Sequence, residues 1–129
     1  MNKSKIATEI INDIYTFNFK YENAKNKFGN GQITETKYAN GLYILLCKTS
    51  YLLKVINKFK EMGYKFARYE KEVCALYNII DQIATSLNNS KLEKLSIHEN
   101  FSLVTYLTKY ENILKVFKDE ELKDKVEHN

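Results

Sequence analysis

The near absence of helix-breaking residues is the strongest constraint that this sequence places on its fold. The 129 residues include no proline and only four glycines. A sandwich or a barrel needs many tight turns, whereas long helices tolerate a chain with so few turn residues. The length fits one domain with one core. We therefore expect a single all-α domain that covers residues 1–129.

Apolar residues recur every three or four positions through four segments, which is the period of a helix with one packed face. We expect long helices at about residues 4–28, 34–62, 65–88 and 97–118, and a short helical turn near residues 91–95. Because the long helices are joined by short connections, they favour an antiparallel up-down four-helix bundle. The charged end of the chain, residues 119–129, is expected to fray.

Turn and capping residues mark two helix ends. Gly63 can adopt the left-handed conformation that ends a helix, in which case Tyr64 packs back onto Phe59. Ser96 and Glu99 have the spacing of a capping box, which predicts a helix start at this point.

The first two helices carry a second apolar row beside the core stripe. At 100° per residue, these rows lie roughly 100° to 180° from the centre of the stripe. The two helices form a hairpin that folds near residue 31, so the rows would lie side by side. The resulting hairpin patch consists of Ile11, Tyr15, Phe19, Tyr43, Cys47 and Tyr51. A patch this rich in aromatic residues is typical of an interaction surface, so we expect it to bind a protein partner or a second copy of the chain, most simply as a dimer.

The position of the two later helices decides whether this patch is exposed. If they lie beside the hairpin, both rows face solvent and are free to bind. If they sandwich the hairpin, both rows belong to the core. The sequence leaves both arrangements open.

Positive charge gathers in the first half of the chain. Residues 1–63 carry ten basic and five acidic side chains, a net charge of +5, whereas residues 64–129 carry ten basic and eleven acidic ones, a net charge of −1. The hairpin brings the start of its first helix near the end of its second helix. This predicts a basic patch that consists of Lys3, Lys5, Lys54, Lys58 and Lys60. Such a patch attracts a partner with acidic character.

Nucleic acid is the alternative partner. Lysines of the hairpin could contact phosphates while its tyrosine rings stack on bases. However, Arg68 is the only arginine, although arginine is the usual residue for bidentate contacts to phosphate and guanine. We therefore rank nucleic acid behind a protein partner.

The sequence offers no catalytic or metal-binding motif. It has two histidines, His98 and His128, and neither belongs to an HExxH or Glu-x-x-His pair. Cys47 and Cys74 are 27 residues apart, match no metal-ligand spacing and are expected to be reduced thiols in the core. We expect a protein that is not an enzyme and that needs neither a cofactor nor a metal.

The remaining expectations concern location and class. The basic N-terminus precedes no apolar run of signal-peptide length, and the most apolar window, residues 38–56, contains Lys48 and Lys54. We therefore expect a cytoplasmic protein, in a bacterium or in an infected cell, that crosses no membrane. Small basic helical bundles occur among immunity proteins, phage-encoded inhibitors and accessory proteins of mobile elements. The sequence thus favours a non-enzymatic inhibitor, immunity or accessory factor.

Overall fold

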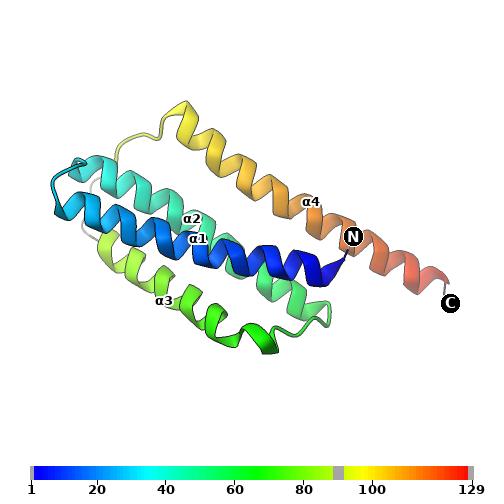
Figure 1. Ribbon diagram of the computed structural model, residues 1–129. Coiled ribbons are helices and arrows are strands. Elements are labelled where there is room, and N and C mark those ends of the chain that lie inside the picture. Colours follow the sequence, from blue (N-terminus) through cyan, green and yellow to red (C-terminus); the bar gives the residue numbers. More distant parts are fainter. Residues whose placement is uncertain (1, 89–91, 128–129) are drawn as a thin grey trace.

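The computed structural model describes residues 2–88 and 92–127, which contain four long helices. They are α1 (Lys3–Gly29), α2 (Glu35–Glu61), α3 (Glu70–Leu87) and α4 (Ile97–Glu127), with a 3-10 turn, η1 (Ala67–Tyr69), before α3. Successive helices run in opposite directions (Figure 1). The antiparallel four-helix bundle predicted from the sequence is therefore confirmed.

The hairpin of α1 and α2 lies between the other two helices. α3 packs against both helices of the hairpin, whereas α4 packs along α2 on the opposite side (Figure 1). This is the sandwiched arrangement, so parts of the second apolar rows turn inward. Ile11 of α1 is buried as a result.

The apolar stripes of the four helices meet in one core. Its fully buried members come from every helix and include Ile10, Ile14, Leu52, Ile56, Leu76, Ile83 and Tyr110. Where α2 ends, the core finishes in an aromatic cluster. The ring of Phe59 lies with its centroid 5.4 Å from that of Phe117 and 6.4 Å from that of Phe66. These edge-to-face contacts tie the end of α2 to α4 and to the start of the α3 segment.

Both predicted helix ends are confirmed. Gly63 has φ +89°, the Tyr64 N–H donates to the Phe59 carbonyl over 3.0 Å, and the two aromatic rings are in edge contact. The Ser96 N–H donates to the Glu99 carboxylate over 2.9 Å, while the Glu99 N–H donates to the Ser96 hydroxyl over 3.1 Å. The capping box thus fixes where α4 begins.

Three boundaries differ from the sequence prediction. α3 begins at Glu70 and not at residue 65, because Tyr64 and Phe66 first turn into the aromatic cluster beside Phe59. Residues 92–96 form no helical turn, since Asn40 of α2 accepts the Glu93 N–H over 3.2 Å and holds this connection in a non-helical form. Residue 91 of that predicted turn lies outside the described residues.

The third difference is the length of α4. The helix continues to Glu127, so the segment from 119 onward that was expected to fray is helical throughout its described part. Its lysines and glutamates have good helix propensity, and the buried Phe117 anchors the preceding turn.

The two cysteines were expected in the core, and this prediction is wrong. Cys47 is half-buried and Cys74 is exposed.

Two glycines, one just after the end of α2 and one in its interior, allow a test of where this helix ends. Gly63→Ala should lower the free energy of unfolding by about 1 kcal/mol, because an alanine is strained at positive φ. Gly41 lies in the exposed interior of α2, where an added Cβ would meet nothing within 4 Å. Gly41→Ala should therefore raise the free energy of unfolding by roughly 0.5 to 1 kcal/mol. Urea unfolding measures both; shifts of the same sign would contradict these assignments.

Candidate protein interface

The predicted hairpin patch is divided by the packing of α3 and α4. Ile11 is only 4% exposed, because α3 packs along this face of α1, so its predicted place in a binding surface is wrong. One turn later, Tyr15 is exposed and donates its hydroxyl to the Glu72 carboxylate of α3 over 2.8 Å. Phe19 follows and is 71% exposed. The part of the hairpin patch on α1 therefore begins with a buried residue, Ile11, and continues with two exposed residues, Tyr15 and Phe19, beside α3.

The part of the hairpin patch on α2 faces the other side of the hairpin, where α4 lies. Tyr43 is exposed, whereas Cys47 and Tyr51 are half-buried. Burial and the nearby Glu111 of α4 both raise the pKa of Tyr51. The two rows thus turn toward different neighbours, α3 and α4, and Ile11 no longer links them. A partner-binding role for their exposed members stays a prediction.

The predicted basic patch lies at the end of the bundle where α1 begins and α2 ends. The Lys3 ammonium lies 5.9 Å from the centroid of the Phe117 ring. That ring contacts Phe59, which stands between Lys58 and Lys60 in the sequence. The two other predicted members, Lys5 and Lys54, are exposed on α1 and α2.

α4 adds lysines to this end that the sequence did not assign to it. A groove of about 520 Å³ runs between α2 and α4, with Met62 and Leu114 among its lining residues. Lys58, Lys115 and Lys118 line the same groove, together with two glutamates, Glu61 and Glu121. The lysines of α2 and α4 lie together here because of the position of α4 along α2. The spacing of apolar residues in the sequence does not specify that position.

The most exposed apolar residue of the described chain, Ile97, lies on α4 with two further exposed apolar residues, outside every predicted site. Ile97 is 91% exposed, Phe101 68% and Val104 58%. Their spacing of i, i+4 and i+7 places them on one face of the helix, which we call the α4 outer row. The same spacing outside the core stripe is visible in the sequence and could have revealed this row.

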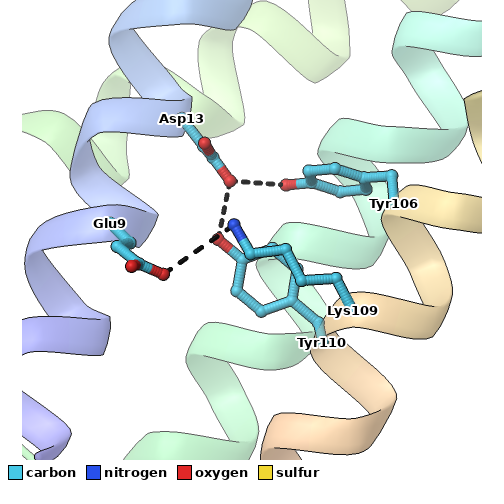
Figure 2. Close-up of polar contacts among 5 residues, drawn as sticks. All are labelled: Glu9, Asp13, Tyr106, Lys109 and Tyr110. Carbon is cyan, nitrogen blue, oxygen red and sulfur yellow. Dashed lines mark hydrogen bonds and ion pairs between the residues drawn. The ribbon is translucent and has the colours of Figure 1, made fainter.

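A polar seam fixes which face of α4 turns outward. The Asp13 carboxylate of α1 accepts a hydrogen bond of 2.6 Å from the Tyr110 hydroxyl and one of 3.2 Å from the Tyr106 hydroxyl (Figure 2). Beside them, the Lys109 ammonium lies 3.8 Å from the Glu9 carboxylate. Because all the α4 members face α1, the helix cannot rotate without losing these contacts.

A lysine of α2 extends the seam toward the start of α4. The Lys48 ammonium donates to the Ser102 hydroxyl over 3.0 Å and lies 5.7 Å from the centroid of the Tyr106 ring. Burial and the nearby Lys20 lower the pKa of Lys48. Between residues 102 and 110, α4 therefore contacts the hairpin both through these polar groups and through its tyrosine rings, of which Tyr106 packs edge-on against Phe17 of α1.

The seam also determines how its tyrosines ionise. Burial is the largest cause that raises the pKa of both Tyr106 and Tyr110 above the ordinary tyrosine value, and the Asp13 carboxylate raises both further. Hydroxyls that stay protonated remain hydrogen-bond donors to the carboxylate. These hydrogen bonds to Asp13 are therefore kept at every pH near neutrality.

Within residues 2–88 and 92–127, no group of three or more His, Cys, Asp or Glu side chains is placed to hold a metal ion. Within the same residues, no helix combines the length and apolarity that a membrane crossing requires. Neither a protein-family model, nor a curated protein, nor a solved structure matches this chain.

The seam tyrosines predict a decline in stability at alkaline pH. Their folded-state pKa lies above the value of about 10 in the unfolded chain, so their contribution is complete below pH 10 and is lost as the pH rises further. The slope is at most about 1.4 kcal/mol per pH unit for each tyrosine. Urea unfolding between pH 9 and 11 should therefore show a shallower decline in the double variant Tyr106→Phe/Tyr110→Phe.

The exposed Tyr15 provides the control for this experiment. Tyr15→Phe removes a hydroxyl that also bonds a carboxylate, Glu72, but at the surface. It should change the alkaline slope less than the seam variant does. Equal slopes in the original protein and the seam variant would contradict the assigned role of the seam.

Proposed function

We propose that this chain is a non-enzymatic protein-binding bundle that contacts its partner through the α4 outer row. The observation that carries the proposal is the exposure of Ile97, Phe101 and Val104 together on one helix face. Single exposed apolar residues are common on protein surfaces. Three on one face, including an aromatic ring, are typical of a surface that another protein covers.

The packing beneath the row favours binding by a rigid surface. α4 is anchored through Asp13 at its middle and through the buried ring of Phe117 further along. The capping box of Ser96 and Glu99 orders its first turn, next to Ile97. A surface that is already ordered loses little conformational entropy on binding.

The biological class that we propose is a small inhibitor, immunity or accessory factor of a bacterium, phage or mobile element. Proteins of this class act by binding one partner, for which a short rigid bundle is sufficient. We place its action in the cytoplasm, since both cysteines are free thiols and such thiols fit a reducing compartment.

Nucleic acid remains the second candidate, because of the groove at the basic end. Lys58, Lys115 and Lys118 line it and could contact phosphates. Two carboxylates, those of Glu61 and Glu121, line the same groove and would repel a phosphate backbone. Protein binding through the α4 outer row has no such opposing charge.

Site-specific photo-crosslinking tests the proposed function. Benzoylphenylalanine in place of Phe101 should form a covalent adduct with another polypeptide in cells that carry the gene. The matched control is the same replacement at Tyr77, an exposed aromatic residue of α3 that lies outside every predicted site. Adducts at position 101 and not at 77 are expected. Adducts at neither position, or at 77 alone, would refute binding through the α4 outer row.

A further inference from the structure

We propose that a pocket between α1 and α2 binds a small amphipathic carboxylate, whose apolar body enters the pocket while its charged end contacts Lys20 and Lys48. The pocket has a volume of about 230 Å³ and is formed by both helices of the hairpin. All of its described lining residues belong to the hairpin, so this inference does not depend on binding through the α4 outer row.

The course of α4 leaves this part of the hairpin uncovered. Ser102 of α4 contacts Lys48, and from there back toward its start α4 lies apart from α2 (Figure 1). Beyond this contact, the groove between α1 and α2 stays open as the pocket. A small molecule can therefore enter without rearrangement of the bundle.

The wall of the pocket is largely apolar and includes one position without a side chain. Leu42, Ile44 and Leu45 of α2 supply apolar surface, as does Ala24 of α1. Gly41 lies among them, and a Cβ atom added there would meet nothing within 4 Å. A glycine destabilises a helix interior relative to alanine, but here its missing side chain keeps the pocket open. An apolar group placed against this wall is removed from water.

The pocket carries positive charge that its own lining does not balance. Lys20 and Lys48, one from each helix, are the charged residues of the described lining. The Lys48 ammonium donates to a neutral group, the Ser102 hydroxyl, over 3.0 Å. Burial lowers the pKa of Lys48 most, and the repulsion from Lys20 outweighs the attraction of the Asp13 carboxylate. An anion beside the two ammonium groups would relieve this repulsion.

The groove between α2 and α4 differs in this respect. Its lysines share the lining with Glu61 and Glu121, and the Lys58 ammonium lies 3.4 Å from the Glu61 carboxylate. The protein itself balances much of the positive charge there. The hairpin pocket is thus the better site for an anion, and Lys58 provides a control position.

The size and the charged groups of the pocket define the class of ligand. Its volume lies just below the range of roughly 300 to 1,000 Å³ that is usual for ligand pockets, which fits a short alkyl or aromatic body. Two ammonium groups favour a compact carboxylate over a phosphate group, which proteins commonly hold with arginine or with backbone N–H groups at a helix N-terminus. For so small a ligand in an open site, we expect a dissociation constant of about 0.1 to 1 mM.

An NMR titration of the full chain with octanoate tests this inference. Amide signals of residues 20–24 and 41–48 should shift in a saturable manner. Acetate has the charge without the apolar body, and octylammonium has the apolar body with the opposite charge. Neither should cause saturable shifts at up to about 10 mM. Saturable shifts with acetate or with octylammonium would overturn the proposed class of ligand.

Substitutions locate the site. Gly41→Leu fills the pocket with a good helix-forming residue, so it should abolish octanoate binding and leave the unfolding temperature at least as high. Lys48→Gln should raise the dissociation constant about tenfold and Lys20→Gln about threefold, because Lys48 is half-buried and Lys20 is exposed.

Lys58→Gln is the matched control, since it removes a lysine from the other groove, and it should leave the dissociation constant unchanged. Circular dichroism of each variant verifies that the helices are retained. Retained binding in Gly41→Leu, or a loss in Lys58→Gln equal to that in Lys48→Gln, would overturn the site. The absence of saturable shifts with octanoate at up to about 10 mM would overturn the proposal as a whole.

Discussion

The carboxylate of Asp13 fixes the orientation of α4, and the character of the exposed surface depends on it. It accepts hydrogen bonds from two tyrosines one turn apart, Tyr106 and Tyr110, so it constrains both the rotation of α4 and its position along α1. A half-buried carboxylate that lost these donors would be costly. With the tyrosines held inward, Ile97 and Phe101 are directed outward.

The two halves of α4 consequently differ. Around Ile113 and Phe117 the helix buries apolar side chains against the hairpin, as a surface helix ordinarily does. Near its start, the inner face combines polar contacts, such as that of Ser102 with Lys48, with packing of the Tyr106 ring against Phe17, and the outer face is also apolar. The hydrogen bonds of the inner face fix the rotation of α4 and so leave this apolar outer face exposed. The fold and the proposed interface therefore have one physical origin, the inner contacts of the first half of α4.

Short-range patterns predicted much of the fold. The heptad stripes located the four helices, and local chemistry located their ends at Gly63 and at Ser96. What depends on contacts distant in sequence could not be predicted. Ile11 belongs to the core because α3 packs over its face of α1, and no local signal reports the side on which α3 lies. The pairing of Asp13 with tyrosines more than ninety residues away likewise became visible only in three dimensions. The hairpin register predicted which rows were neighbours but not which helices would cover them.

Hydrogen–deuterium exchange, followed by mass spectrometry, tests the central role of Asp13 most directly. The comparison is between the original protein and Asp13→Ala, which removes the acceptor shared by the two tyrosines. We expect amides of residues 97–127 to lose protection while those of α1, α2 and α3 keep it, because the variant loosens α4 without unfolding the other three helices. Unchanged protection of α4, or an equal loss in all four helices, would contradict the account.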